Sequence, residues 1–522
     1  MGIPRGKLTK SAGQLASVLL PLYASAALLL FSFPQPWCFR AAAWVALVPW
    51  LFVLRHSGPR RAFLYSWLVG AVFFTIGVGW LRFVTLPGWL LLSVYLAFYF
   101  ALFGCLYRLM GRWGLLSAPF IWVGLELARA RLLTGFPWFS LGYSQATLLP
   151  LIQVADFGSV YAVSFIILLV NVALAEVAAA ISARSKVAVR RAALASAAAA
   201  LLVLAAIAYG AWRLRTIPIE QGPRVAVVQG NIPQSVKESH GTAYEVLAGH
   251  LALSDTVQEG SVDMILWPET MVLVPLNLSE GYRAILADLA QEKKAHLLVG
   301  AHSAIEGKYY NSAYFFSDDG ILLGRYDKLH LVPFGEYIPL GRFLSFISRI
   351  VPYEEGLTPG AAPVVFRLGN LNFSVLICYE DTISELVREV APPYPGFLVN
   401  LTNDGWFRGS AELEQHLEIS SFRAIETRMG LVRAANTGIS ALISPTGKVE
   451  RILAGEGGSS KEVEGVLIGR VAVGRVLPAP YAKVGDLFAF SCAVVALAAI
   501  AAALVTSFRR KRICLTSKGG SV

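Results

Sequence analysis

Acidic residues are missing from the first 125 positions of this 522-residue chain, and charged residues make up only 15% of the whole. An ordinary soluble protein has roughly 25% charged residues. Hydrophobic residues, in contrast, reach 56%. This shortage of charge excludes an ordinary, fully soluble globular protein.

The formal net charge of +11 comes from one part of the chain. Residues 1–212 contain 16 lysines and arginines and three acids, whereas residues 213–522 contain 29 bases and 31 acids. A nucleic-acid-binding domain gathers its basic residues on a polar surface, but here the basic excess lies in the most hydrophobic region. We therefore expect no nucleic-acid partner.

Cysteine is also scarce. Four of the five cysteines lie in or beside long apolar runs, and Cys378 alone lies in the polar region. A single thiol cannot form a disulfide within its own domain, and no Cys or His spacing fits a zinc site. The region also has no dinucleotide-binding glycine fingerprint, so we expect no metal and no cofactor. Composition alone favours an inert, buried Cys378 over a reactive one.

Long apolar runs dominate the amino-terminal region. A helix needs about 20 apolar residues to cross a hydrocarbon layer roughly 30 Å thick. Uncharged stretches of this length, or close to it, lie at 11–39, 62–81, 83–107, 157–175, 192–212 and 487–508. Two weaker candidates are the short stretch 41–54 and the stretch 115–128, which contains Glu126. Together they predict about eight transmembrane helices, seven before the polar region and one after it.

The basic residues between these stretches predict an orientation. With the amino terminus in the cytoplasm, 17 bases fall on cytoplasmic segments and four on short external loops, which agrees with the positive-inside rule. Removing one of the first seven spans would break this alternation. We therefore expect both termini in the cytoplasm and the segment 213–485 on the external side.

The segment 213–485 has the pattern of a separate α/β domain. It contains short apolar runs flanked by Gly, Pro, Asn and Asp, as buried strands are. The clearest runs are 224–228, 264–267, 296–299, 371–378 and 397–401. Helical patterns lie between them, notably at 281–294 and 411–429. We expect a mixed α/β domain with its own core.

Cys378 lies where one predicted strand ends, between the apolar residues 375–377 and the polar residues 379–381. A thiol attacks as its thiolate, which requires a base, and the resulting oxyanion requires a cation or N–H donors. Glu269 and Lys328 also follow predicted strands. These positions favour a nucleophilic Cys378, with Glu269 and Lys328 as the candidate base and cation.

Four motifs then carry a family resemblance. The order WPE, YDKLHLVPFGEYIP, CYED and NLTNDGWF resembles the carbon–nitrogen hydrolase (nitrilase) superfamily over residues 224–474. That resemblance implies an α-β-β-α sandwich with a Glu–Lys–Cys triad. Seven preceding spans and one following span make nearly the whole chain similar to the apolipoprotein N-acyltransferase family.

The resemblance implies a fold class and domain limits. The fold is expected to be an α-helical membrane bundle of about eight transmembrane helices plus an external nitrilase-like α/β domain. The limits are a membrane domain at 1–212, a catalytic domain at 224–474, an eighth span at 486–508 and a basic cytoplasmic tail at 509–522.

The resemblance also implies roles for individual residues. Glu269 is the expected general base, Lys328 the oxyanion-binding cation and Cys378 the nucleophile that becomes a thioester. Glu336 matches a second carboxylate near the lysine. The residues that match pocket-forming positions are Tyr379, Glu380 and Trp406.

The implied reaction is the last step of bacterial lipoprotein maturation in the inner membrane. A glycerophospholipid, expected to be phosphatidylethanolamine, donates an acyl group through the thioester to the terminal amine of a diacylglyceryl-cysteine apolipoprotein. One alternative is a membrane-tethered amidase or nitrilase acting on a small soluble substrate. Another is a transporter or scaffold whose external domain only binds.

Several other segments carry secondary expectations. The segment 334–351 has helix-like apolar spacing that suits either an amphipathic interfacial arm or a buried helix. Glu126 and the loop 135–138 are candidates for contact with lipid head groups. In the helix expected at 411–429, we expect a buried, paired Arg423 and a hydrogen-bonded, structural His416.

Overall fold

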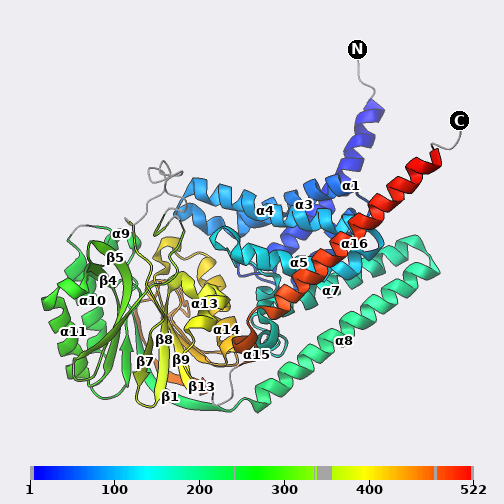
Figure 1. Cartoon of the computed structure of the whole chain (residues 1–522). Helices are drawn as coiled ribbons and strands as arrows, with labels where there is room; N and C mark the ends of the chain where they lie inside the picture. The colour runs from blue at the N-terminus through cyan, green and yellow to red at the C-terminus, as the bar shows by residue number, and fades with distance from the viewer. Residues whose placement is uncertain (1–4, 240, 334, 338–355, 475–478, 519–522) are drawn as a thin grey trace.

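The computed structural model describes residues 5–239, 241–333, 335–337, 356–474 and 479–518, and divides into a helical half and a β-sandwich half (Figure 1). The longer helices of the helical half are α1 (Arg5–Phe31), α2 (Val48–Arg55), α3 (Pro59–Gly77), α4 (Leu86–Leu109), α5 (Gly114–Arg131), α7 (Ala155–Ala183), α8 (Lys186–Thr216) and α16 (Leu487–Lys518). Two short helices are α6 (Leu149–Ile152) and α15 (Pro480–Val484).

Four of these helices are long and apolar enough to cross a membrane: α4, α7, α8 and the Leu487–Thr506 part of α16. A shorter apolar stretch lies at Leu15–Phe31 in α1. The membrane character expected from the sequence is therefore confirmed, whereas the count of eight spans stays a prediction.

Two predicted segments differ in extent from the helices of the structure. The stretch 41–54 is not one helix, because a turn at 45–47 separates a short 3₁₀ turn, Arg40–Trp44, from α2. The eight residues of α2 span only about 12 Å. At the other end, α16 continues beyond residue 508 to Lys518, so most of the predicted basic tail is helical.

The sandwich half contains two six-stranded paths of hydrogen-bonded strands. The first sheet has the order β13-β1-β2-β4-β5-β6, with β3 (Val272–Pro275) paired to β4, and the second has the order β12-β11-β10-β9-β8-β7. Strands of the first sheet are β1 (Ile219–Gln229), β2 (Met264–Leu266), β4 (His296–Ile305), β5 (Lys308–Phe316), β6 (Leu322–Asp327) and β13 (Gly465–Gly474). Those of the second are β7 (Val365–Leu368), β8 (Leu371–Ile377), β9 (Gly396–Thr402), β10 (Gly430–Ala435), β11 (Ala441–Ile443) and β12 (Val449–Ile452).

Alternation of side chains along these strands produces three apolar layers. In β8, Val375 and Ile377 point into the core between the sheets, whereas Leu376 packs on the outer face. The outer face of the first sheet is covered by α10 (Ala243–Asp255) and α11 (Glu280–Lys293). That of the second is covered by α13 (Ser384–Val390) and α14 (Glu412–Thr427). This arrangement confirms the α-β-β-α sandwich.

Helix α14 joins the two halves of the molecule. One face packs on the second sheet, and Ile419, Phe422 and Ile425 on the other face join the core of the helical half. Gln415 accepts hydrogen bonds from the indole nitrogens of Trp80 (3.2 Å) and Trp138 (2.9 Å). The sandwich is thus fixed against the helices through a helix that is buried on both faces.

Candidate active site

Cys378 sits on a sharp turn at the end of β8. Its φ of +54° lies in the left-handed region, which costs a non-glycine residue on the order of 1–3 kcal/mol. The next residues form a 3₁₀ turn, Cys378–Thr382, and the Glu380 carboxylate accepts the Ile377 N–H (2.7 Å). This bond holds the strained turn, so the partly buried thiol is presented at the strand end.

Lys328 follows β6 directly and is held between two carboxylates. Its Nζ lies 2.8 Å from Glu336 Oε1 and 3.3 Å from Glu269 Oε1. Asn311 in β5 donates from Nδ2 to the same two oxygens, at 3.2 Å and 2.7 Å. We call Glu269, Asn311, Lys328 and Glu336 the lysine network; all four side chains are buried.

Both carboxylates of the lysine network have further backbone donors. Glu269 Oε2 accepts the Asn403 N–H (2.8 Å), just after β9, and Glu336 Oε2 accepts the Val332 N–H (2.7 Å). Hydrogen bonds to a charged acceptor are stronger than neutral ones. These bonds fix the orientation of the two carboxylates around the ammonium group.

The charges of this network act on both Lys328 and Cys378. Burial alone would lower the pKa of Lys328, but Glu336 and Glu269 hold it well above its ordinary value. Burial and the Glu269 charge raise the pKa of the Cys378 thiol well above its ordinary value, and Lys328 only partly offsets them. Lys328 is therefore a cation and Cys378 a protonated thiol at neutral pH.

The two residues after Cys378 lie in different environments. Glu380 is fully buried and accepts hydrogen bonds from the Tyr326 hydroxyl and from the N–H groups of Leu329, His330 and Ile377. Burial raises the pKa of Glu380 to about 7. The Glu380 carboxylate therefore connects the loop after Lys328 to the Cys378 turn and holds the two in position.

Tyr379 connects the Cys378 turn to the helical half. Its ring stacks on Trp138, with centroids 6.4 Å apart, and its hydroxyl donates to Gly135 O (3.2 Å). The loop 135–138 therefore contacts the sandwich half. Glu126 is also structural, because it accepts the Trp122 indole N–H (2.8 Å) and the Leu141 N–H (2.7 Å). Contact of these residues with lipid head groups stays a prediction.

A second buried charge cluster lies behind Cys378. Arg433 in β10 donates to Asp404 Oδ2 (2.8 Å) and lies 3.4 Å from Asp381, while His416 Nε2 is 2.7 Å from Asp381 Oδ1. We call Asp381, Asp404, His416 and Arg433 the arginine network. His416 is buried and hydrogen-bonded, as expected, and its structural role stays a prediction. The buried pairing of Arg423 is confirmed, here with Glu426 (2.8 Å).

The arginine network also contains a group with metal-like geometry. Ligand atoms of Asp404, Glu412 and His416 lie within 4.8 Å of one another. Arg433 Nη2, however, lies 2.8 Å from both Asp404 Oδ2 and His416 Nδ1. The guanidinium group supplies the positive charge that a metal ion would bring, so these residues fit a salt-bridge network better than a metal site.

The family follows from the comparisons with known proteins. Residues 25–173 match the apolipoprotein N-acyltransferase N-terminal domain, and residues 224–481 match carbon–nitrogen hydrolase. The apolipoprotein N-acyltransferase of Geobacter metallireducens is 37% identical over 94% of this chain and 95% of its own. The chain belongs to the apolipoprotein N-acyltransferase family. The resemblance seen in the sequence is thereby confirmed, together with the membership in the nitrilase superfamily.

A second curated relative carries the same family name. The apolipoprotein N-acyltransferase of Rhodopseudomonas palustris is 32% identical over 93% of this chain and 92% of its own. Among solved structures, an amidase from Nesterenkonia sp. has 17% identity and a TM-score of 0.36, covering 51% of this chain and 95% of its own. The family name supports an acyltransferase that acts on lipoproteins at a membrane.

Sequence reasoning missed residues that complete both networks. Asn311, the Asn403 backbone N–H and Arg433 were not among the predicted site residues. Asn311 and Arg433 lie inside strands rather than after them, and Asn403, although it lies in the NLTNDGWF motif, acts through its backbone. Trp406, which was predicted to line the pocket, is half-buried in the 3₁₀ turn Asp404–Phe407, and its role stays a prediction. Of the segment 334–351, all but residues 335–337 lies outside the described residues.

Proposed function

We propose that this protein transfers a fatty acyl group from a glycerophospholipid to the amino terminus of diacylglyceryl-modified apolipoproteins through a thioester on Cys378. The observation that carries the proposal is the lysine network beside the strained Cys378 turn. A carboxylate, a buried cation and a thiol follow the ends of β2, β6 and β8 there.

In the first half-reaction, the Cys378 sulfur attacks the ester carbonyl carbon while Glu269 takes the thiol proton. Charge then develops on the carbonyl oxygen, where Lys328 and the Tyr379 backbone N–H are the proposed donors. One such preorganised donor contributes roughly 10²–10³-fold to the rate. The carbon–oxygen bond breaks, and the proton passes from Glu269 to the departing lysophospholipid.

In the second half-reaction, the acceptor's α-amine attacks the thioester carbonyl, and Glu269 takes a proton from the nitrogen. The carbon–sulfur bond breaks, the amide forms, and the proton returns to the sulfur. Glu336 keeps Lys328 in place throughout, because it makes the shorter of the two ion pairs. Water has to be excluded while the thioester waits, which favours a pocket that opens toward lipid.

The proposed orientation has seven spans before the catalytic domain and one after it, with that domain in the periplasm and both termini in the cytoplasm. The proposed domain limits are 1–212 for the membrane domain, 224–474 for the catalytic domain, 486–508 for the eighth span and 509–522 for the cytoplasmic tail. The positive-inside pattern supports this orientation. So does the arrangement in Figure 1, where the start of α1 and the end of α16 lie on the side remote from the sandwich.

An acyl-labelling experiment tests the proposed function. Purified protein in micelles is mixed with phosphatidylethanolamine labelled in its acyl chain and quenched in acid, and the label is located by mass spectrometry. We expect an acyl group on Cys378 of the wild-type protein and none in the Cys378→Ser variant. One lysophospholipid should be released for each acyl group bound. An unacylated wild-type protein that releases ammonia from small amides would establish the amidase alternative instead.

A further inference from the structure

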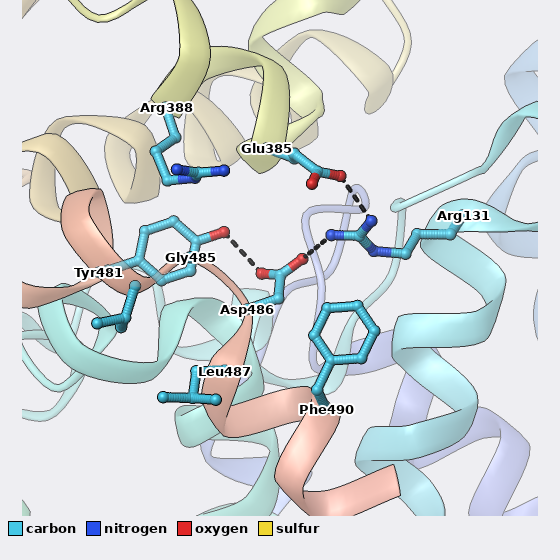
Figure 2. A pocket seen from close by; sticks show the side chains of 9 residues that line it. Arg131, Glu385, Arg388, Tyr481, Gly485, Asp486, Leu487 and Phe490 are labelled. Carbon is cyan, nitrogen blue, oxygen red and sulfur yellow. Dashed lines mark hydrogen bonds and ion pairs between the residues drawn. The ribbon is translucent and has the colours of Figure 1, made fainter.

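A small mixed-charge pocket lies apart from Cys378, where three elements meet. It is formed by the end of α5, by α13 and by the turn between α15 and α16, and it encloses about 150 Å³. Figure 2 shows Arg131, Glu385 and Asp486 around its polar side and Leu487 and Phe490 on its apolar side.

Arg131 is already paired within the protein and is not the proposed ligand-binding group. Its guanidinium group lies 2.6 Å from Glu385 and 2.7 Å from Asp486, so it bridges two carboxylates. The Tyr481 hydroxyl donates to the other oxygen of Asp486 (2.7 Å). These contacts fasten α13 to the outer ends of α5 and α16.

Arg388 is the exception in this pocket. Among the described residues it has no hydrogen-bond acceptor and no ion-pair partner, and its Nε is buried without one. A buried polar group without a partner requires an explanation, such as a missing ligand. The side chain lies over Gly485, where an added Cβ would come within 3.2 Å of Arg388 Nε. The absence of a side chain at residue 485 thus leaves room for the guanidinium group of Arg388.

The apolar side of the pocket continues along α16. Leu487, Phe490 and Val494 are 57%, 46% and 65% exposed, on a helix apolar enough to cross a membrane. With α16 in the bilayer, its first turn lies at head-group depth and these side chains face acyl chains. The pocket therefore combines an unpaired guanidinium group with an apolar side that continues along α16.

We propose that this pocket binds the phosphate of an outer-leaflet glycerophospholipid, with Arg388 as the main donor and the acyl chains lying on Leu487, Phe490 and Val494. A phosphate fits because guanidinium groups bind phosphate oxygens in pairs. Glu385, which is half-exposed, suits the cationic end of a zwitterionic head group. The site is not catalytic. It rests on α16 crossing the membrane, and not on the reaction at Cys378.

The test is photolabelling of the full-length Cys378→Ser protein in maltoside micelles, which carry no phosphate. Two probes carry the same diazirine near the glycerol: a phosphatidylethanolamine and a diacylglycerol without the phosphate. We expect the phospholipid to label residues 484–490 roughly tenfold more than the diacylglycerol. A hydrogen bond to a charged group strengthens binding by about this factor, and the diacylglycerol has no phosphate to make one. In Arg388→Gln the ratio falls to about one, and in Arg388→Lys it falls only in part.

Two matched variants control for disruption of the pocket and for loss of charge. Arg367→Gln removes an exposed arginine of β7 and should keep the ratio. Glu385→Gln removes a carboxylate from the pocket itself and should lower the ratio less than Arg388→Gln does. The proposal is overturned if Arg388→Gln labels like its parent, or if Glu385→Gln loses the ratio equally. It is also overturned if excess inorganic phosphate abolishes labelling, since the ligand would then be a soluble anion. Because Cys378→Ser cannot form a thioester, these results are independent of the proposed reaction.

Discussion

Two buried charge networks flank Cys378, and they differ in their cation. The lysine network centres on a single ammonium group between Glu336 and Glu269. The arginine network centres on a guanidinium group bonded to Asp404, His416 and Asn400. A guanidinium group is a rigid fork suited to fixed contacts, whereas an ammonium group is a compact charge that can follow a developing oxyanion. This difference supports the proposal that the lysine network takes part in the reaction and that the arginine network holds the surrounding structure in place.

Replacing Lys328 by Met should have the largest effect. The acylation rate of Cys378 should fall by roughly 10²–10³-fold, because the oxyanion loses its cation. Single-turnover labelling with acyl-labelled phospholipid measures this rate. Lys328→Arg keeps the charge but not its shape, so it should recover only part of the rate. Near wild-type acylation in Lys328→Met would mean that the lysine network is merely structural.

Replacing Arg433 by Met should act mainly on stability. Asp381 and Asp404 would be left buried without their partner, at a cost of about 3–5 kcal/mol. Thermal unfolding should show the loss, with Arg367→Gln as the exposed control. The acylation rate of the protein that remains folded should fall less than in Lys328→Met. A lost rate at unchanged stability would erase the distinction between the networks.

The pH dependence of Cys378 alkylation separates the networks further. Because the thiol pKa is raised, the thiolate fraction, and with it the alkylation rate, should rise about tenfold per pH unit up to at least pH 9. Burial and then the Glu269 charge raise this pKa, and Asp404 contributes less. Glu269→Gln should therefore speed alkylation at a given pH more than Asp404→Asn does. A rate plateau below pH 8 would contradict the raised pKa.

The smallest effect is expected at the contact between the halves. Tyr379→Phe removes the hydrogen bond to Gly135 O and should cost about 0.5–1.5 kcal/mol of stability. The backbone N–H of residue 379 remains, so acylation should stay close to wild type. Calorimetry measures the loss of stability, and the single-turnover assay measures the acylation rate. A large loss of rate would mean that the Tyr379 hydroxyl takes part in the reaction.

The sequence predicted the lysine network better than the arginine network for a physical reason. Glu269, Lys328 and Cys378 each follow an apolar run, so they appear in the sequence as polar residues where a strand leaves the core. His416 and Arg433 lie on α14 and β10, and they meet Asp381 only because β8, β9 and β10 are neighbours in one sheet. Asn403 acts through its backbone N–H, which leaves no side-chain signal.

The helical half shows a different limit. Hydropathy correctly indicated the apolar segments that became α4, α7, α8 and α16, because composition determines which segments a membrane accepts. It did not detect that 41–54 is broken by a turn, since apolar composition does not report whether a helix is continuous. Nor did it reveal the pocket beside Arg388, which depends on where α5, α13 and α16 meet.

The central claim is that the thioester on Cys378 is the intermediate of acyl transfer. A pulse–chase experiment tests it most directly: the protein is acylated by labelled phospholipid, freed of excess donor, and then given a diacylglyceryl-cysteine peptide. We predict that label leaves Cys378 and appears on the peptide's terminal nitrogen at the same rate, in equal amount. Label that stays on Cys378, or that appears only as free fatty acid, would contradict the account.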